Sequence, residues 1–368
     1  MCAAKMHADE PDIDVPLVRR LVAAQFPQWA RLPVTPVDSS GTDNAMYRLG
    51  DDMAVRLPRT RFAADNVDLE QQWLPLLAPR LPVAVPAPLG RGKPGEGYAW
   101  EWSVCRWLVG TNPDADALAG PDALAGPDGL AGAGGLAGAG GLAGAGGMAG
   151  AGQLALDLAE FITALRRIDP ADAPRASRGV PLATRDEPTR KALAELEAQG
   201  EAGEHAAGGD AAGGQHGSDG PGSGRPGSDG AHTHALIDSR AVTAAWDAAL
   251  RAPAPDGSPP AWAHGDLAPG NVLVTPQGRL SAVIDFGAMG VGDPTVDLMV
   301  AWNLLPARAR GTFRAAVGAD DVTWARARGW ALSIALIQLP YYRRTNPVLA
   351  ANSRHVIREV LKEHAHAA

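Results

Sequence analysis

The stretch from Trp262 to Leu298, WAHGDLAPGNVLVTPQGRLSAVIDFGAMGVGDPTVDL, limits the fold of this chain more than any other segment. It contains Asp266 and, five residues later, Asn271, on a polar loop. Two short apolar runs follow, separated by the turn-like sequence TPQGR, and this pattern predicts a β-hairpin. Asp285 comes directly after the second run, where a hairpin returns to its starting edge. The pattern therefore predicts that three polar side chains meet at one end of a hairpin.

These three side chains match the needs of a magnesium-nucleotide site. Mg²⁺ prefers hard oxygen ligands and keeps its other positions for waters and phosphate oxygens. The amide oxygen of Asn271 and the carboxylate of Asp285 are such ligands, while Asp266, on the loop before them, is placed to act as a general base. An ordinary turn after a buried strand would explain any one of these motifs. It does not explain three linked motifs in order and at consistent spacing.

Taken together, the motifs resemble those of the aminoglycoside phosphotransferase family, small-molecule relatives of the protein kinases. The resemblance lies in HGDL with its asparagine, in IDFG, and in GDP followed by DL, which span residues 264–271, 284–287 and 292–298. Protein kinases have the same spacing in H-R-D-L-x-x-x-N, with arginine where this chain has Gly265. That arginine usually pairs with a phosphorylated activation loop. Its absence argues against control by phosphorylation.

The resemblance implies an α+β, two-lobe, protein-kinase-like fold, with a small antiparallel β-sheet in the N-lobe and a mainly helical C-lobe. It also implies an ATP-dependent O-phosphotransferase that uses Mg²⁺ and moves the γ-phosphate to a hydroxyl of a small molecule, such as an aminoglycoside-like or other antibiotic. In this scheme Asp266 is the catalytic base, and Asn271 and Asp285 are the metal ligands. His264 keeps the shape of the loop, and Asp297 anchors the loop from below.

Composition bounds the classes of protein that fit the chain. It has 368 residues, enough for two lobes with their own cores, and a formal net charge of -8, which speaks against nucleic-acid backbones as partners. Cys2 and Cys105 are too few for a disulfide framework or a metal cluster, so we expect a reducing cytoplasm. No segment reaches the roughly 20 apolar residues that cross a bilayer, and the first residues have no apolar run of signal-peptide length. No membrane partner is therefore expected.

Residues 34–57 read as three successive strands, which resemble the phosphate-covering sheet of kinase-like N-lobes. A polar loop joins the first two strands, and its hydroxyl and backbone N–H groups are candidates to hold phosphate oxygens. These candidates are Ser39, Ser40, Gly41 and Thr42. With a single glycine, the loop taken by itself favours a bend in a hairpin. Arg56 lies on the third strand, where the family has a lysine that holds the α- and β-phosphates.

Glu70 belongs to a helix expected over residues 66–77, in which it lies beside an apolar stripe. In the resemblance to the family it is the glutamate that pairs with the strand cation, here Arg56. The alternative is a surface glutamate in contact with solvent. Ser103 and Val104 end the last predicted strand of the N-lobe. They are expected at the hinge, where kinase-like folds bind adenine through backbone groups.

The expected N-lobe covers residues 1–103 and the expected C-lobe residues 104–368, interrupted by two low-complexity insertions. Residues 117–152 repeat a hexapeptide of the type GLAGAG in six copies, too few for a stacked β-helix. We expect a flexible insertion there, between the hinge and the next helix. Residues 200–234 are rich in Gly, Ser, Asp and Ala, and the irregular spacing of their histidines favours a disordered linker over a metal site.

The acceptor site is expected among the helices that follow residue 298. Candidates for contact with the acceptor are polar or aromatic side chains, and core packing explains each of them equally well. They are Asn303, Trp330, Tyr341 and Tyr342. An acidic pocket would favour an aminoglycoside and an apolar pocket a macrolide, while choline, homoserine and other metabolites are alternatives within the same fold. The sequence does not identify the acceptor.

A rival from another class is a nucleotide-binding pseudokinase or interaction module, in which Arg56 marks lost chemistry. Asp266, Asn271 and Asp285 argue against it, because a scaffold needs none of the three. An arginine in place of the lysine still offers a permanent positive charge with several donors in a planar fork. We therefore predict an enzyme that holds the triphosphate through Arg56 and the polar loop before it.

Overall fold

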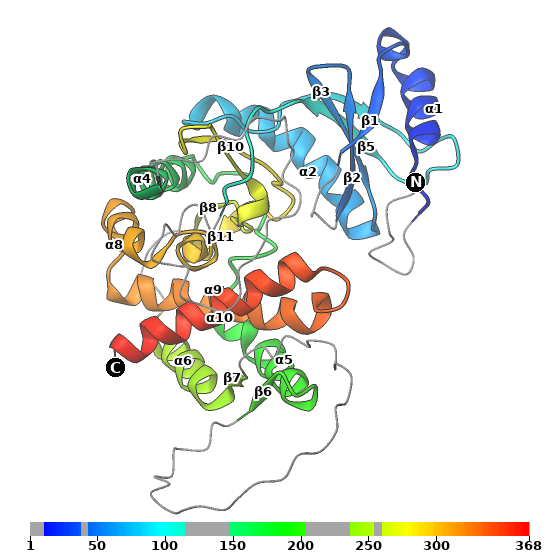
Figure 1. Ribbon diagram of the computed structural model, residues 1–368. Helices are drawn as coiled ribbons and strands as arrows, with labels where there is room; N and C mark the ends of the chain where they lie inside the picture. Colours follow the sequence, from blue (N-terminus) through cyan, green and yellow to red (C-terminus); the bar gives the residue numbers. More distant parts are fainter. Residues whose placement is uncertain (1–10, 38–42, 115–146, 204–235, 254–259, 368) are drawn as a thin grey trace, which may run out of the picture.

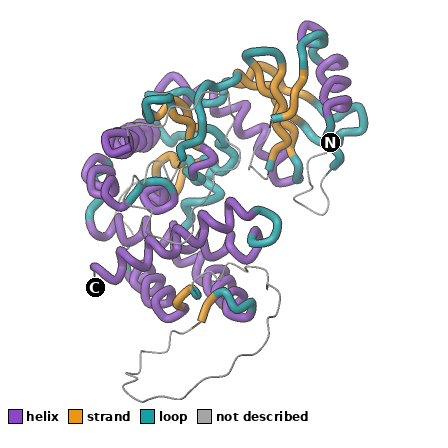
Figure 2. Tube along the Cα trace, viewed as in Figure 1, coloured by secondary structure: helices purple, strands orange, loops and turns teal. Residues whose placement is uncertain are grey.

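The computed structural model of the protein describes residues 11–37, 43–114, 147–203, 236–253 and 260–367, which form two lobes (Figure 1). Figure 2 shows the strands of one sheet gathered in the first lobe and most helices in the second. The expected α+β architecture with two lobes is confirmed. Within the described residues, no helix combines the length and the apolar character that a membrane crossing needs.

The N-lobe contains a five-stranded antiparallel sheet in the order β1-β2-β3-β5-β4. Its strands are β1 (Val34–Pro36), β2 (Asn44–Leu49), β3 (Met53–Pro58), β4 (Pro88–Gly92) and β5 (Trp102–Arg106). Buried and half-buried residues alternate along β2, so one face of the sheet packs on a core that it shares with α1 (Val15–Gln25). The three strands predicted between residues 34 and 57 are therefore present.

Helix α2 (Arg61–Leu77) lies against the sheet, and the apolar side chains of its last turns join the core of the larger lobe. It begins five residues before the predicted start at residue 66, because the hydroxyl of Thr60 caps it by accepting the N–H of Ala63 at 3.2 Å. Glu70 is on the buried face of α2 and is 5% exposed. The interpretation of Glu70 as a surface residue is therefore wrong.

Strand β5 continues to Arg106, beyond the expected hinge at Ser103 and Val104. Both residues pair with β3 on one side and with β4 on the other, so their backbone groups belong to the sheet and not to a hinge that binds adenine. The boundary drawn between residues 103 and 104 cuts through this strand and is corrected. The chain enters the larger lobe at Thr111, which pairs with Val274 through backbone hydrogen bonds of 3.1 and 2.8 Å.

Helix α4 (Gly147–Arg166) begins inside the last copy of the hexapeptide repeat. Ala151, in that copy, is 1% exposed and belongs to the core of the larger lobe. A flexible insertion over residues 117–152 is therefore wrong for residues 147–152, because alanine favours a helix and this copy continues the buried side of α4. The repeat up to residue 146 lies outside the described residues.

The second low-complexity tract is structured where it begins. β6 (Ala202–Gly203) pairs in parallel with β7 (Ile237–Asp238). Glu201 accepts two hydrogen bonds from the Arg354 guanidinium, at 2.8 and 3.2 Å. The expectation of a disordered linker is therefore wrong for the first four residues of the tract, and its remainder lies outside the described residues.

Helix α9 (Asp321–Tyr342) is the centre of the larger lobe. It is buried on most sides, as expected for a helix that is apolar nearly all round. Other helices of the lobe surround it or cover its ends: α5 (Asp186–Ala198), α6 (Ser239–Arg251), α7 (Val300–Asn303), α8 (Ala307–Ala316), α10 (Pro347–Ala367) and the 3-10 helix η6 (Pro294–Met299). The arrangement gives this lobe a rigid helical core beneath the cleft.

The hairpin predicted after Asn271 is present, with β9 (Val272–Val274) antiparallel to β10 (Leu280–Val283). Asp157 of α4 holds the hairpin from outside, because its carboxylate accepts two hydrogen bonds from Arg279 at 2.8 and 2.9 Å. A two-point contact of this kind fixes direction as well as distance. The hairpin is therefore attached to the helical core.

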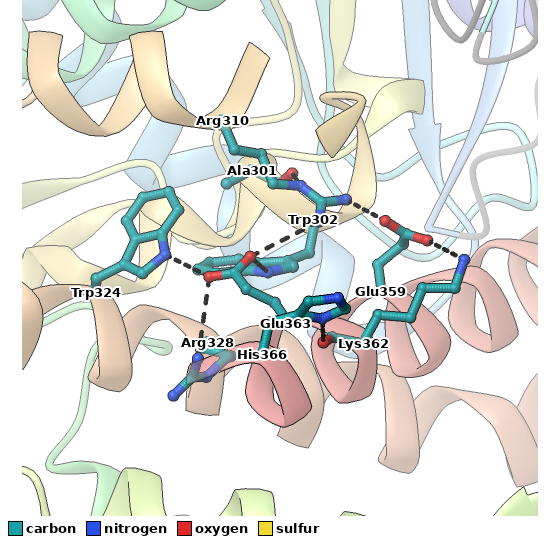
Figure 3. Close-up of polar contacts among 9 residues, drawn as sticks. All are labelled: Ala301, Trp302, Arg310, Trp324, Arg328, Glu359, Lys362, Glu363 and His366. Atoms are coloured by element: carbon teal, nitrogen blue, oxygen red, sulfur yellow. Dashed lines mark hydrogen bonds and ion pairs between the residues drawn. The ribbon is translucent and has the colours of Figure 1, made fainter. Parts of the chain in front are cut away.

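A network of charged and indole side chains fixes α10 against the rest of the lobe (Figure 3). At its centre the Glu363 carboxylate accepts the indole N–H groups of Trp324, at 2.6 Å, and Trp302, at 2.9 Å. Arg310 and Arg328 lie 3.7 and 3.9 Å from the same carboxylate. The donors come from α7, α8 and α9, so one carboxylate ties the last helix to three others.

Candidate active site

Asp297 holds the loop that carries Asp266. It lies in η6, is fully buried, and accepts the backbone N–H groups of His264 and Gly265, each at 2.8 Å. Burial raises the pKa of the Asp297 carboxyl, while the two N–H donors and the charge of Arg166 act in the opposite direction. This places Asp297 beneath the loop, where it orders two successive peptide groups just before the candidate base.

The His264 ring shapes the same loop from inside and does not face the cleft. Its Nδ1 accepts the N–H of Asp266 at 3.1 Å, so its Nε2 carries the proton and donates to the carbonyl of Ile284 at 3.0 Å. The ring is buried and lies edge-on to Phe286, with 4.6 Å between centroids. His264 thus links the loop to Ile284, which lies between the end of β10 and Asp285, and it is not placed to exchange a proton with a substrate.

Gly265 has a backbone conformation and a packing that no other residue would meet. Its φ is +81°, in the left-handed region that favours glycine. A Cβ atom there would lie 2.7 Å from the carbonyl oxygen of Ala288. The arginine that protein kinases have at this place does not fit this backbone.

The hairpin brings Asn271 and Asp285 to the same end as Asp266. The carbonyl of Asn271 accepts the N–H of Ile284 at 2.9 Å, which places Asp285 beside it. The Asn271 amide donates through Nδ2 to the Asp266 carbonyl at 2.9 Å and lies 3.4 Å from the Asp266 carboxylate. This use of the amide N–H group leaves the Asn271 oxygen for a cation.

A magnesium ion fits the donor set at this end of the hairpin. The amide oxygen of Asn271 and the carboxylate of Asp285 are hard donors, and the Asp285 side chain is 33% exposed, which leaves room for waters and phosphate oxygens. Asp285 has a φ of +63°, uncommon for a residue with a side chain and typical of strained functional positions. Across the described residues, no group of three or more His, Cys, Asp and Glu side chains offers another metal site.

Arg56, Glu70 and Asp285 line one pocket between the sheet, α2 and the hairpin, and Ser103 lies in its wall. The Nη1 atom of Arg56 is 2.5 Å from Oε2 of Glu70, and its Nη2 atom is 3.9 Å from Oδ1 of Asp285. Burial lowers the pKa of Arg56, but the two carboxylates outweigh it and raise the pKa above the ordinary value. Burial raises the pKa of Glu70, and Arg56 opposes this effect. The pair therefore places a permanent cation next to the candidate metal ligand.

Arg178, in the loop between α4 and α5, is a site residue that the sequence analysis missed. Its Nη1 atom forms an ion pair with Oδ1 of Asp266 and lies 3.3 Å from the carbonyl of Gly265. The charges of Asp266 and, more weakly, Asp285 raise the pKa of Arg178. No local pattern marks this residue, since the loop sequence RASRGV has no periodicity and the partner lies 88 residues further along the chain.

Asn112, in the segment that enters the larger lobe, is a second residue without a sequence signal. Its Nδ2 atom is within hydrogen-bond distance of three carbonyls of the loop, at 3.1 Å from Pro269 and 3.0 Å from both Gly270 and Val272. One amide thus holds the turn between Asp266 and the hairpin. Its partners lie 157 to 160 residues further along the chain, so only the fold reveals the contact.

Two of the residues expected to contact the acceptor are part of the interior. Asn303 is 8% exposed and donates through Nδ2 to the carbonyl of Leu267 at 2.7 Å, so it supports the catalytic loop from below. Trp330 is fully buried in α9. The expectation of acceptor contact is corrected for both, because they face the core. Tyr341 is 60% exposed and packs edge-on against Tyr342, so its role stays a prediction.

The remaining candidates belong to the nucleotide side of the cleft. Residues 39–42, expected to hold phosphate oxygens, lie outside the described residues. Ser103 lines the pocket with Arg56, whereas Val104 is fully buried in the core of the sheet. A backbone contact with adenine is therefore not available at Val104, and a hinge contact would have to come from the segment after residue 106.

A β-sheet lobe over a helical lobe, with an arginine-glutamate pair, a loop carboxylate and two candidate oxygen ligands where the lobes meet, is the arrangement of kinase-like phosphotransferases that act on an alcohol group. A family model described as the phosphotransferase enzyme family, APH, matches residues 34–330. The chain belongs to this family. No curated protein sequence matches it.

Solved structures of other phosphotransferases share the fold. The complex of APH(2'')-IIia with GDP and kanamycin has a TM-score of 0.60 and 19% identity, covering 94% of this chain and 98% of its own. The GDP complex of wild-type aminoglycoside 2'-phosphotransferase-IIIa has a TM-score of 0.60 and 18% identity, covering 96% and 100%. The apoenzyme of macrolide 2'-phosphotransferase MphH from Brachybacterium faecium has a TM-score of 0.51 and 19% identity, covering 94% and 97%. At such identities the likeness concerns the fold.

Proposed function

We propose that the protein is an ATP-dependent O-phosphotransferase that uses Mg²⁺ and moves the γ-phosphate to a hydroxyl of a small molecule. The observation that carries this proposal is the meeting of Asp266, Asn271 and Asp285 at one end of the β9–β10 hairpin, opposite the Arg56–Glu70 pair. A base, two oxygen ligands and a phosphate-binding cation are the parts that phosphoryl transfer requires. An interaction module would need none of them.

In this mechanism each residue has one task. Arg56 binds the α- and β-phosphates, and Glu70 keeps its guanidinium in place. Asn271 and Asp285 would hold the metal ion, which would offset the negative charge of the phosphate oxygens. Asp266 accepts the proton of the acceptor hydroxyl while that oxygen forms a bond to the γ-phosphorus and the bond to the leaving ADP breaks.

We propose a small-molecule alcohol as the acceptor and the cytoplasm as the location of the protein. An aminoglycoside or a macrolide, as named for the relatives, is one class of such alcohols, and choline, homoserine and related metabolites are others. A polycationic aminoglycoside is bound best by carboxylates. Among the described residues, the charged side chain that contacts Asp266 is Arg178, a cation, which disfavours that class.

Two single variants test the proposal. Asp266→Asn should lower kcat by roughly 10² or more while the affinity for Mg-ATP holds, because a general base contributes about that much. Asp285→Asn should instead weaken the binding of Mg-ATP. Titration of Mg-ATP and of acceptor panels in steady-state kinetics separates the two effects, with Asp51→Asn, in the exposed turn between β2 and β3, as the control. Unchanged turnover in Asp266→Asn would remove this residue as the base.

A further inference from the structure

Arg185 is a half-buried cation without an acidic partner. It ends the 3-10 helix η4 (Leu182–Arg185), and its Nε donates to the hydroxyl of Ser333 on α9 at 3.2 Å. The guanidinium carbon lies 5.8 Å from the centre of the Trp330 ring. Within the ranges that the structure describes, no carboxylate pairs with this guanidinium, and none raises its pKa.

The environment of Arg185 opposes its charge. Burial and the like charge of Arg178 both lower the pKa of Arg185, whereas the pKa of Arg178 is raised by Asp266. A guanidinium stays protonated at neutral pH in spite of such shifts, and a charge taken from water is costly unless a counter-ion is present. The fold therefore keeps a positive charge here whose counter-charge the described residues do not supply.

Arg178 connects this cation with the base. It lies seven residues earlier in the same segment, pairs with Asp266, and is close enough to Arg185 for their charges to repel. The two guanidiniums, which we call the Arg178–Arg185 pair, contact Asp266 at one end and Ser333 of α9 at the other. A molecule whose hydroxyl meets Asp266 also meets Arg178, the first member of this pair.

The acceptor that the described residues give to Arg185 is a neutral hydroxyl. The Ser333 hydroxyl, which accepts from Arg185, also shares a hydrogen bond of 2.7 Å with Thr189. A guanidinium that donates to one neutral hydroxyl keeps donors for a ligand that brings acceptor oxygens and negative charge.

We propose that the acceptor carries an anionic group, a carboxylate or a phosphate ester, which binds to the Arg178–Arg185 pair and directs the acceptor hydroxyl to Asp266. This inference rests on the proposed function, because it concerns the acceptor side of the same site. Arginine forks recognise both anions through two parallel hydrogen bonds. Since one arm of Arg178 contacts Asp266, the bound anion shares or replaces that contact and leaves the base free for the hydroxyl.

Binding tests the proposal without turnover. The full chain with Mg-ADP is titrated by calorimetry with short hydroxy acids, with sugar phosphates, with neutral polyols of the same length and with an aminoglycoside. We expect one of the two anionic series to bind, and the neutral and cationic compounds to bind at least about 10-fold more weakly. The series that binds tells a carboxylate from a phosphate ester. Equal binding of anions and neutral polyols, no binding of any anion, or tighter binding of the aminoglycoside overturns the proposal.

Variants then assign the binding to the guanidinium. Arg185→Ala should weaken the binding of the anion about 10- to 100-fold, and Arg185→Lys should weaken it less, since the lysine keeps the charge but loses the fork. Lys191→Ala, which removes an exposed cation from neighbouring α5, should have no effect. Thermal unfolding of each variant shows whether it is folded. An anion that binds Arg185→Ala and the wild type equally well contradicts the proposal.

Kinetics keep this inference apart from the proposed function. If an alcohol of any charge supports Mg-ATP turnover that depends on Asp266, the proposed function holds. If that alcohol is neutral or cationic and its KM is the same in Arg185→Ala, only the anionic acceptor is wrong. If anions bind through Arg185 but no compound supports turnover and Mg-ATP does not bind, the phosphotransferase is wrong and the anion site stands.

Discussion

The nucleotide cleft and the Glu363 network on α10 are both built from arginines and carboxylates, but they balance their charges differently. In the cleft, the guanidiniums of Arg56 and Arg178 face three carboxylates, Glu70, Asp285 and Asp266. On α10, two carboxylates face two guanidiniums and a lysine, and they also accept two indole N–H groups. Around Arg56, on the nucleotide side of the cleft, carboxylates thus outnumber guanidiniums, and in the network on α10 they do not.

The difference teaches which network is complete and which needs a ligand. Both oxygens of Glu363 receive an N–H group from a rigid indole, so this carboxylate has no need of a further partner. Asp285 and Asp266 are 33% and 28% exposed in their side chains, and together they leave lone pairs open to the cleft. A network in which every polar group is paired stabilises the fold. A network with unpaired groups can instead bind cations and phosphates.

The largest effect should follow from breaking the pair in the cleft. Arg56→Ala should raise the KM for ATP and lower kcat, so that kcat/KM falls by about 10² or more, because the phosphates lose a charged contact. Glu70→Ala should have a smaller effect that is not additive with it, since both residues position the same phosphates. Steady-state kinetics of the two single variants and the double variant measure the coupling.

The control for this cycle is Arg91→Ala, which removes an exposed arginine that pairs with Asp68 and Glu101 in the same lobe. It should leave the ATP kinetics as they are. If the effects of Arg56→Ala and Glu70→Ala on the ATP kinetics are fully additive, or if Arg56→Ala has normal ATP kinetics, the pair has only a structural role. Either result would support the pseudokinase alternative.

A smaller effect is expected on α10, and it concerns the stability of the fold and not the activity. Glu363→Gln should lower the free energy of unfolding by about 2 kcal/mol, less than the full loss of a buried ion pair because this side chain is 27% exposed. The kcat/KM of the folded variant should stay within about two-fold of the wild type. Urea unfolding and kinetics on the same sample provide both numbers, with Glu197→Gln, at an exposed position of α5, as the control. Lost activity at unchanged stability would show that this network belongs to the site.

The smallest effect concerns pH. Burial raises the pKa of Glu359, but the hydrogen bond from Lys362 and the charge of Arg310 outweigh it and lower the pKa below the ordinary 4.5. The unfolded chain then binds this proton more readily, so the ionised group adds stability above pH 4.5 that is lost as the pH falls through the folded pKa. Glu70, whose pKa is raised, acts in the opposite sense, and its cost grows as the pH rises above 4.5.

Unfolding measured between pH 3 and 7 checks this contrast, the range being set by the ordinary carboxyl pKa of roughly 4. Glu359→Gln should reduce the acid loss of stability by less than about 1 kcal/mol, and Glu70→Gln should not reduce it. Equal slopes in the wild type and in Glu359→Gln would mean that the network on α10 adds nothing to acid stability.

The sequence by itself determined the local part of the site. Asp266, Asn271 and Asp285 lie within one loop and one hairpin, and turn residues and strand periodicity decide how such a short segment closes. The side of α2 on which Glu70 lies followed from helical spacing in the same way, although its burial did not. Short separations along the chain make these placements independent of the rest of the molecule.

Only the tertiary structure decided the rest. Arg178 meets Asp266 across 88 residues and Asn112 meets Pro269 across 157, and no local pattern tells which loops come together. Whether Trp330 faces a substrate or the core depends on the helices packed around α9, and the end of β5 depends on its pairing with β3 and β4. Local sequence sets backbone geometry over a few residues, but burial and long-range ion pairs arise only when distant segments pack together.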